Sequence, residues 1–551
     1  MSELANFLQM VESLAGQPNV TRPSDLELRQ AAERYGTRTS FGNYVFHTMV
    51  KNRSAGATVY LGSPAVQLPS MSPRQQELVA QLPQTLAAVQ RYVAKAPLVC
   101  VERSMGDNPT FVPFCRTYVS VARPEMVRIA YMWWSMLNAP NPSAPGPKQT
   151  LIYVPEWQEK DRQILVFPEQ NLTLVLGSDY LGESKKGHLR MAMWNAKQQG
   201  MLGVHAGAKL ITARDAKTGR LRRYAMIIFG LTATGKTTHA CHNHGLTAPG
   251  ERIEIVQDDV VFLRPDGGAY GSERGFYLKT EGINAQTQPL LYHTATQRDA
   301  IFENVMVDYQ GQVDFNDETL TSNGRGVVQW ADFGSAKAAT PNLPPLADVD
   351  GLIVAFITRR NTVVPIASKL TLEQGAAAFM LGESIESSGG DPRRAGESVR
   401  VVGTNPFIVG DLAFEGNRFY EFLKSHPDKV QCYLLNTGGV GELTERRPDG
   451  RREILRKVLR VEIPEMASII RGIVRNTIEW VDEPLFGTRV PKAVEGVEMT
   501  KFALDRFYAP PQVEELASSL QRERADYLGR FAGLHPAIAA AGSSPIRATA
   551  R

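Results

Sequence analysis

The chain is 551 residues long, which is more than one hydrophobic core usually organises, so we expect two domains or one large domain with an appendage. Its 61 Lys and Arg against 57 Asp and Glu give a net charge of +4, too small and too dispersed to indicate nucleic acid as the main partner. The four cysteines form no C-x-x-C pair, and no stretch approaches about 18 uninterrupted apolar residues. The sequence therefore predicts a cytoplasmic enzyme with no membrane partner and no disulfide framework, and it leaves the oligomeric state open.

The first 200 residues mix short β-like runs with helical patterns. Strands are expected at residues 44–46, 58–61, 98–101, 151–154, 164–167 and 172–176, and a helical pattern covers residues 74–95. The proline-rich stretch 139–147 is typical of a connection on the surface.

A second block begins near residue 201. Strands are expected at residues 224–229, 253–256, 351–357 and 431–435, with helices near 371–384 and over 511–532. Strands mixed with helices indicate α/β architecture. The glycine-rich stretch 383–396 is typical of a mobile loop, and residues 541–551 are typical of a disordered tail.

A complete phosphate loop follows the strand expected at 224–229. Residues 230–237 read Gly-Leu-Thr-Ala-Thr-Gly-Lys-Thr, which fits G-x-x-x-x-G-K-S/T. A buried strand followed by such a loop and a helix directs backbone N–H groups at nucleotide phosphates. Lys236 is then expected at the outer phosphates, and the Thr237 hydroxyl at a Mg²⁺ that bridges them. A glycine turn with a solvated lysine is the plain alternative, and the preceding strand argues against it.

Other polar residues become informative only in combination. Asp258 and Asp259 follow the strand expected at 253–256, where carboxylates are placed to hold a metal beside the phosphates. Upstream lie the paired lysines Lys185 and Lys186, and then His205. Taken singly, each of these is most simply a solvated turn or a satisfied side chain.

In this order, the segments resemble the ATP-dependent phosphoenolpyruvate carboxykinases. The resemblance rests on Tyr180-Leu-Gly-Glu-Ser-Lys-Lys-Gly187, on His205, on residues 230–238 and on Asp258-Asp259. Further matching segments lie at 51–54, 108–117, 298–305, 323–325, 365–374 and 435–438. The resemblance implies a two-domain α/β carboxykinase-like fold. Residues 1–200 are then a substrate-side domain and residues 201–540 a P-loop nucleotide-binding domain with a mobile lid near 383–396. The active site is expected in the cleft between them.

The resemblance also implies a reaction. Oxaloacetate and ATP would give phosphoenolpyruvate, ADP and CO₂, a step of gluconeogenesis, through an enolate that attacks the γ-phosphate. Because that nucleophile is already an anion, catalysis depends on positioning and charge neutralisation more than on a strong base. A site rich in lysine, arginine and metal ligands suits this chemistry.

The resemblance assigns the second metal and the nucleotide contacts. Lys186, His205 and Asp259 are expected to bind Mn²⁺, which would polarise the substrate carbonyl and stabilise the enolate, and a lysine can ligate only when neutral. The expected contacts with ATP and Mg²⁺ are Gly230, Leu231, Thr232, Ala233, Thr234, Gly235, Lys236, Thr237, Thr238, Gln288 and Arg325.

The same resemblance assigns the substrate contacts. Arg53 is expected to hold a substrate carboxylate, and Tyr180 to face the substrate or the released CO₂. Lys185 and Arg325, with Lys236, are expected to neutralise the phosphoryl group during transfer.

Several positions depart from the family pattern. Gln288 stands where an acidic residue usually lines the nucleotide side, with Glu281 nearby, and the segment after Arg53 lacks two lysines. The residues after Lys369-Leu-Thr371 also differ. The arginine that contacts adenine is left open among Arg446, Arg447, Arg451 and Arg452. Two alternatives therefore stay open: a related kinase for another small carboxylate, and a catalytically weakened nucleotide-binding regulatory relative.

A histidine-rich segment follows the phosphate loop. It contains His239, Cys241, His242 and His244. On one continuous helix, only His239/His242 and Cys241/His244 would be three apart, and these pairs would point to different faces. We therefore do not expect a zinc site there.

Overall fold

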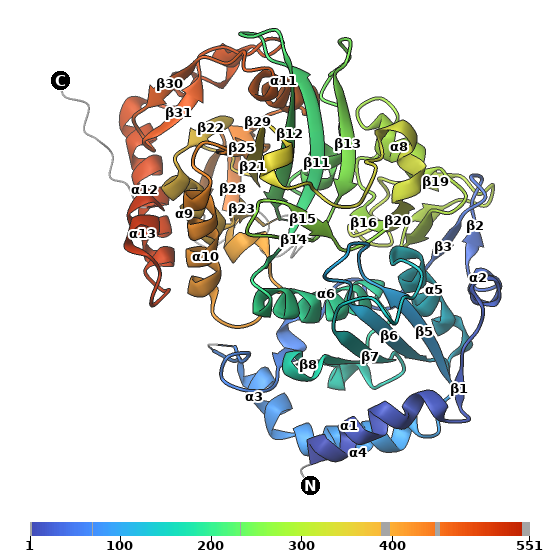
Figure 1. The fold of residues 1–551 in the computed structure, drawn as a ribbon. Coiled ribbons are helices and arrows are strands. Elements are labelled where there is room, and N and C mark those ends of the chain that lie inside the picture. The colour runs from blue at the N-terminus through green and yellow to red at the C-terminus, as the bar shows by residue number, and fades with distance from the viewer. Residues whose placement is uncertain (1–2, 69, 232, 387–396, 447–451, 543–551) are drawn as a thin grey trace.

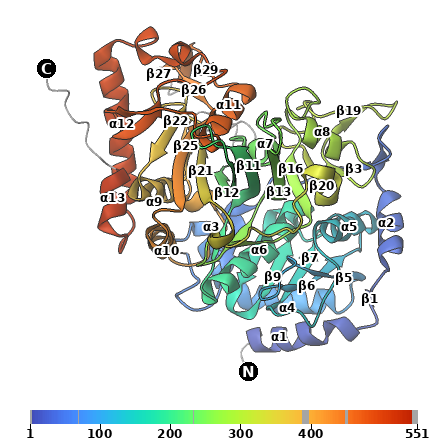
Figure 2. The same cartoon turned by 45° about the horizontal axis from the view of Figure 1, so that its top comes forward.

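Figure 1 shows the fold of the computed structural model, which describes residues 3–68, 70–231, 233–386, 397–446 and 452–542. It is a mixed α/β structure with several sheets, as the sequence predicts. Two large sheets dominate it, and the long helix α6 (Leu181–Gln198) lies between them in both views (Figures 1 and 2).

The first large sheet has seven strands from the N-terminal part. Its order is β1 (Val20–Thr21), β5 (Leu98–Ser104), β6 (Phe114–Ser120), β7 (Lys148–Val154), β9 (Leu172–Leu176), β8 (Gln163–Phe167) and β4 (Thr58–Tyr60). Alternate residues face opposite sides, so Ile152 packs on the side of helices α1 (Glu3–Ser13) and α4 (Leu82–Val93), and Leu151 packs on the side of α5 (Val127–Met136) and α6. Covering both faces with helices explains why these strands are apolar throughout.

The second large sheet has eight strands. Its order is β13 (Arg252–Gln257), β11 (Ala206–Arg214), β12 (Leu221–Gly230), β21 (Gly351–Thr358), β25 (Val430–Asn436), β22 (Ala367–Leu370), β31 (Thr488–Pro491) and β30 (Trp480–Glu483). The strands β12, β21 and β25 run parallel at its centre. One face is covered by α9 (Leu372–Leu381), α10 (Leu412–Ser425) and α13 (Pro536–Gly542), and the other by α7 (Lys236–Cys241) and α11 (Ile463–Val474).

Smaller sheets connect the two large ones. A five-stranded sheet joins β2 (Thr37–Arg38) and β3 (Tyr44–Phe46) to β16 (Gly275–Lys279), β17 (Ile301–Glu303) and β20 (Arg325–Gln329). A three-stranded sheet contains β10 (Leu202–Val204), β14 (Val261–Leu263) and β15 (Ala269–Gly271). Strand β3 thus pairs with β17 from the second half of the chain, and β2 pairs with β3 at the edge of that sheet. The division into domains at residues 200/201 stays a prediction.

Most expected elements lie where the sequence places them. The strands at 44–46, 151–154, 224–229 and 351–357 correspond to β3, β7, β12 and β21. The helical pattern at 74–95 is two helices, α3 (Pro73–Ala80) and α4, because Pro83 stands in the first turn of α4, where its missing N–H costs no hydrogen bond. The pattern at 511–532 corresponds to α12 (Pro510–Leu528).

Two expected mobile segments lie largely outside the described residues. Of the stretch 383–396, residues 383–385 form β23 (Glu383–Ile385), which pairs with β24 (Ser398–Arg400), and residues 387–396 are not described. Of the expected tail, Ala541 and Gly542 end α13, and residues 543–551 are not described. Within the described ranges, no helix combines the length and apolar character that a membrane crossing needs.

Candidate active site

One edge of the eight-stranded sheet gathers the predicted site residues. Strand β11 runs antiparallel to both β12 and β13, so its first residue lies at the edge where β12 and β13 end. His205 immediately precedes β11, the phosphate loop follows β12, and Asp258 and Asp259 follow β13. Strand order therefore brings three segments that are separate in the sequence to one place.

The phosphate loop passes between β12 and α7. Gly230 has no room for a side chain, because a Cβ there would lie 2.6 Å from Thr234 Oγ1, and Gly235 adopts a φ of 97° that favours glycine. The Thr437 hydroxyl donates to the Thr234 carbonyl at 2.7 Å and ties the loop to the end of β25. Ala233 has a left-handed φ of 63°, and Thr232 lies outside the described residues.

The Asp259 carboxylate is the centre of a charged cluster. Its Oδ2 lies 2.5 Å from Lys186 Nζ and 2.8 Å from Lys185 Nζ. Its Oδ1 lies 2.8 Å from His205 Nε2 and 3.1 Å from Lys236 Nζ. Each of these side chains is at most 11% exposed, so water screens their charges weakly. Helix α6 supplies two of the lysines, the phosphate loop the third, and the sheet edge the carboxylate.

The two adjacent lysines have different protonation equilibria. Burial lowers the pKa of Lys186 to about 7, since the nearby positive charge of Lys185 adds to burial and the attraction of Asp259 only partly opposes it. Burial would also lower the pKa of Lys185, but Asp259 and Glu273 together outweigh burial and raise it. Glu273 Oε2 lies 2.9 Å from Lys185 Nζ. A second carboxylate therefore keeps Lys185 charged while Lys186 can be neutral near pH 7.

His205 is held as a neutral imidazole whose Nε2 faces the charged cluster. Burial lowers the pKa of His205 to about 4, and the charge of Lys236 adds to this effect. Its Nδ1 lies 2.6 Å from the carbonyl oxygen of Thr404, which can only accept, so Nδ1 carries the proton and the Nε2 lone pair accepts from Lys236 Nζ at 3.2 Å. Thr404 has a left-handed φ of 50°, and its hydroxyl accepts from the Gly230 N–H at 3.2 Å. One residue therefore supports both His205 and the phosphate loop.

These donors fit a divalent transition metal. A neutral amine at Lys186, an imidazole nitrogen at His205 and the carboxylate of Asp259 converge within hydrogen-bond distance. Nitrogen and carboxylate ligands of this kind suit Mn²⁺. The carboxylate is ionised, since Lys185, Lys186, Lys236 and His205 together hold the pKa of Asp259 well below its ordinary value despite burial.

A second set of oxygen ligands lies at the phosphate loop. Asp258 is 2% exposed, and its Oδ1 has no hydrogen-bond partner among the described residues. Burial raises the pKa of Asp258, while Lys236 and a hydrogen bond with Thr237 oppose that shift. A carboxylate oxygen without a partner beside a threonine hydroxyl fits Mg²⁺, which prefers oxygen ligands.

Phe407 is the centre of a second cluster on the substrate side. Its ring lies 4.5 Å from Arg53 Cζ, 4.5 Å from Lys186 Nζ and 5.5 Å from Arg190 Cζ. The aromatic face attracts cations without neutralising them, so the two guanidinium groups and the Lys186 amine gather around one ring. Nothing in the sequence pattern singled out Phe407, because an Asn-Pro-Phe segment is also typical of an ordinary buried turn.

Tyr180 and Arg325 lie on the other side of the lysines. The Tyr180 hydroxyl accepts from Asn323 Nδ2 at 3.3 Å, and the Tyr180 ring lies 6.4 Å from that of Tyr277. Arg325 Cζ lies 5.6 Å from the Tyr277 ring, and Lys185 Nζ lies 5.5 Å from it. Tyr277 is therefore a further aromatic group between two of the predicted phosphoryl contacts, and the sequence did not identify it.

Comparison with known proteins identifies the family of this chain. A sequence profile of the family described as Phosphoenolpyruvate carboxykinase matches residues 21–500. A relative from Aeropyrum pernix named phosphoenolpyruvate carboxykinase (ATP) is 31% identical over 445 residues, which cover 79% of this chain and 82% of the relative. The chain belongs to the ATP-dependent phosphoenolpyruvate carboxykinase family. Relatives of the same name from Afipia carboxidovorans and Rhodopseudomonas palustris are each 26% identical, cover 71% of this chain, and are themselves covered to 69% and 68%.

Gln288 occupies the position where the family resemblance predicts an acidic residue. Its Oε1 accepts from the Thr238 hydroxyl at 2.9 Å, and its Nε2 donates to the Gly282 carbonyl at 2.8 Å. Glu281, the nearby acid, forms an ion pair with Lys279. Gln288 therefore joins the helix of the phosphate loop to residues 282–288. Of the candidate adenine contacts, Arg446 and Arg452 end β27 (Leu443–Arg446) and begin β28 (Arg452–Arg456), and Arg447 and Arg451 lie outside the described residues.

The expectation for the histidine-rich segment of this carboxykinase was wrong in one respect. Helix α7 ends at Cys241, so His242 and His244 are not helical and do not follow the spacing of a continuous helix. The rings of His239, His242 and His244 come together, with centroids 5.2 to 6.4 Å apart. Over the part of the chain that the structure describes, no three His, Cys, Asp or Glu side chains are grouped so that they could hold a metal.

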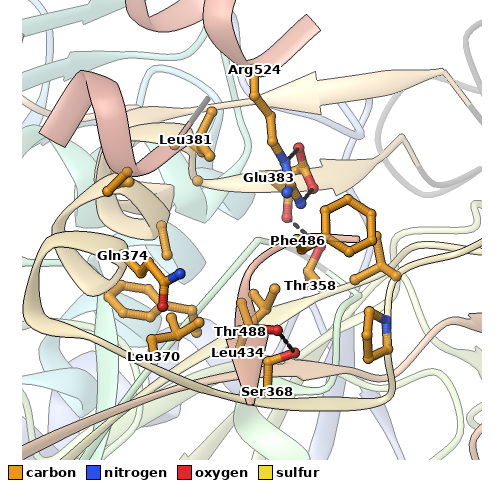
Figure 3. A pocket seen from close by; sticks show the side chains of 18 of the residues that line it. Thr358, Ser368, Leu370, Gln374, Leu381, Glu383, Leu434, Phe486, Thr488 and Arg524 are labelled. Carbon is orange, nitrogen blue, oxygen red and sulfur yellow. Dashed lines mark hydrogen bonds and ion pairs between the residues drawn. The ribbon is translucent and has the colours of Figure 1, made fainter. Parts of the chain in front are cut away.

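An apolar cavity is lined by residues that include Leu381, Leu434 and Phe486 (Figure 3). It encloses about 70 Å³ between β21, β22, β25, α9 and the C-terminal helices. Its polar side chains pair with each other, Arg524 with Glu383 at 2.7 Å and Thr488 with Ser368 at 3.3 Å. These four side chains are therefore not free to bind a phosphate, and the predicted metal ligands Lys186, His205 and Asp259 lie instead in the charged cluster around Asp259.

Proposed function

We propose that the protein catalyses the ATP-dependent conversion of oxaloacetate into phosphoenolpyruvate, ADP and CO₂. The contacts of Asp259 are the observation that supports this proposal most strongly. Its buried carboxylate contacts two lysines of α6, a histidine just before β11 and the lysine of the phosphate loop. The relatives from three organisms are named for this activity. A gluconeogenic role and a cytoplasmic location belong to the proposal, and the four buried free cysteines are consistent with a reducing compartment.

We propose that the residues divide the reaction between two sides. On the substrate side, Arg53 holds a carboxylate of oxaloacetate near Phe407, and Tyr180 faces the carboxylate that leaves as CO₂. When the bond to that carboxylate breaks, its electron pair becomes the enolate of pyruvate. Lys186, His205 and Asp259 would hold Mn²⁺, which would polarise the substrate carbonyl, and Thr237 and Asp258 would hold Mg²⁺, which would neutralise phosphate charge.

On the nucleotide side, the backbone of residues 230–235 and the side chain of Lys236 hold the phosphates of ATP. The enolate oxygen bonds to the γ-phosphorus as the bond to the bridging oxygen of ADP breaks. Lys185, Lys236 and Arg325 place positive charge around the phosphoryl group during this transfer. The carboxylate of Glu273 supports this by raising the pKa of Lys185. We place the reaction in a cleft between an N-terminal substrate-side domain and a P-loop nucleotide-binding domain, where closure would exclude water.

A product analysis tests this function against its alternatives. Purified protein is mixed with ATP, Mg²⁺ and Mn²⁺, and with oxaloacetate, pyruvate or malate in separate samples, and products are followed by ³¹P NMR. Phosphoenolpyruvate from oxaloacetate alone is the expected result. A phosphorylated product from another carboxylate would favour the related kinase. Binding of ATP without any phosphorylated product would favour the regulatory relative.

A further inference from the structure

Lys209 is a buried lysine that forms no ion pair with a carboxylate among the residues that the structure describes. It lies in the middle of β11, between β12 and β13, and its side chain is fully buried. Burial lowers its pKa to about 7, and the nearby Cys241 thiol opposes this shift only in part. Isolated buried amines are costly. An apolar residue at this position could not donate the hydrogen bonds that the Lys209 amine makes.

The Lys209 amine binds the far end of the phosphate-loop helix. Its Nζ donates to the carbonyl of His239 at 2.5 Å and to the carbonyl of His242 at 3.2 Å, and it also contacts Nε2 of His244. The last carbonyls of a helix have no partner within the helix, and a donor at that end satisfies them and favours the helix dipole. Both the charged and the neutral amine can donate to these two carbonyls.

Helix α7 depends on such support because it has only six residues. Helices this short are not stable by themselves in water. Its first two residues are Lys236 and Thr237, and His239 lies less than one turn farther on. Beyond the helix, His242 Nδ1 accepts from the His244 N–H at 2.8 Å, and His244 adopts a left-handed φ of 55°. Lys209 and the segment 239–244 thus form one buried unit beneath the phosphate loop.

We propose that Lys209 is a positioning residue for ATP. By holding the C-terminal carbonyls of α7, it fixes the direction in which Lys236 and Thr237 leave the start of the same helix. This inference rests on the proposed role of those two residues at the phosphates of ATP. Substrate contacts such as Arg53 and Phe407 belong to other segments, so the effect of Lys209 is specific to the nucleotide.

The test compares Lys209→Met with Lys209→Gln and with a matched control. Methionine fills the same space without a donor, glutamine keeps one donor, and Lys429→Met removes a lysine that donates to the Val349 carbonyl at 2.9 Å, away from the loop. The Kd for ATP is measured by titration calorimetry, and KM for oxaloacetate and kcat by product formation. Lys209→Met is expected to raise the Kd for ATP about tenfold, because two buried carbonyls lose their donor. Lys209→Gln is expected to raise it less, and Lys429→Met not at all.

The outcomes separate this inference from the proposed function. An unchanged KM for oxaloacetate beside a raised Kd for ATP supports the positioning role. If Lys209→Met does not fold, the folded Lys209→Gln protein must still show weaker ATP binding. A Kd for ATP equal to that of the wild type in either folded variant would overturn the inference while leaving the carboxykinase proposal intact. A wild-type protein that fails to bind ATP would overturn both.

Discussion

Lys186 Nζ lies 2.5 Å from Asp259 Oδ2, and yet burial lowers the pKa of Lys186 to about 7. A lysine this close to a carboxylate normally stays charged. Here Lys185 and Lys236 contact the same carboxylate, so its negative charge is shared among several cations. The consequence is an amine that can lose its proton near neutral pH and serve as a ligand.

Removing this amine should abolish turnover without unfolding the protein. Lys186→Met keeps the bulk of the side chain but supplies no lone pair of an amine, and we expect kcat to fall about 1000-fold or more. The Kd for ATP, measured by calorimetry, should change little. Lys197→Met is a control on the same helix, about three turns from Lys186, where Lys197 donates to the Val409 carbonyl and pairs with Glu415. Comparable losses in both variants would show that helix stability, and not the amine, is responsible.

Phe407→Leu should weaken substrate binding. The ring attracts Arg53 and Lys186, and each buried contact of this kind contributes about 0.5–2 kcal/mol. We expect KM for oxaloacetate to rise about tenfold in steady-state assays, with the Kd for ATP unchanged. Phe333→Leu is the matched control, because Phe333 is equally buried and packs against Phe276. If KM for oxaloacetate were unaltered in Phe407→Leu, the ring would have no part in substrate binding.

Restoring an acid at position 288 should weaken the enzyme rather than improve it. Gln288→Glu replaces the amide that donates to the Gly282 carbonyl with a second acceptor. Two facing acceptors in a buried place cost about 1–3 kcal/mol, so we expect KM for ATP to rise about three- to tenfold. Steady-state kinetics with varied ATP check this. A higher kcat in Gln288→Glu would instead favour the catalytically weakened relative.

The pH dependence of stability should report on Lys209. Its pKa is about 7 in the folded state against an ordinary value of 10.5, so above pH 7 the unfolded chain binds more protons and stability rises with pH. Relative to Lys209→Met, the wild type should gain roughly 1–2 kcal/mol of unfolding free energy between pH 7 and pH 9. Burial lowers the pKa of His239 to about 3 and that of His242 to about 4, so neither titrates in this window. Urea unfolding at several pH values measures the difference, and a constant difference would contradict the assignment.

Local sequence patterns predicted most of the strands and helices. The strand before the phosphate loop is an uninterrupted apolar run, and Gly230 is required where a Cβ would meet Thr234. The end of α7 could not be predicted in the same way. Nothing in residues 236–244 stops a helix by composition, and the helix ends where its carbonyls meet Lys209, which lies on another strand.

The same contrast holds at the active site. The ordered motifs predict that Lys186, His205 and Asp259 lie together, because each residue belongs to a segment that resembles the family. Glu273, Thr404 and Phe407 belong to no such segment, and they reach the site through strand pairing and loops far along the chain. Residues that orient a ligand through a hydrogen bond or a ring contact follow no recognisable motif spacing in the sequence.

The stoichiometry of one reaction tests the central claim most directly. Purified wild-type protein and Asp259→Asn are each given oxaloacetate, ATP, Mg²⁺ and Mn²⁺, and phosphoenolpyruvate, ADP and CO₂ are quantified in the same sample. We predict equal amounts of the three products from the wild type and about 1000-fold less from Asp259→Asn, with ATP still bound by both. Release of CO₂ without phosphoenolpyruvate, or equal phosphoenolpyruvate formation by Asp259→Asn, would contradict the account.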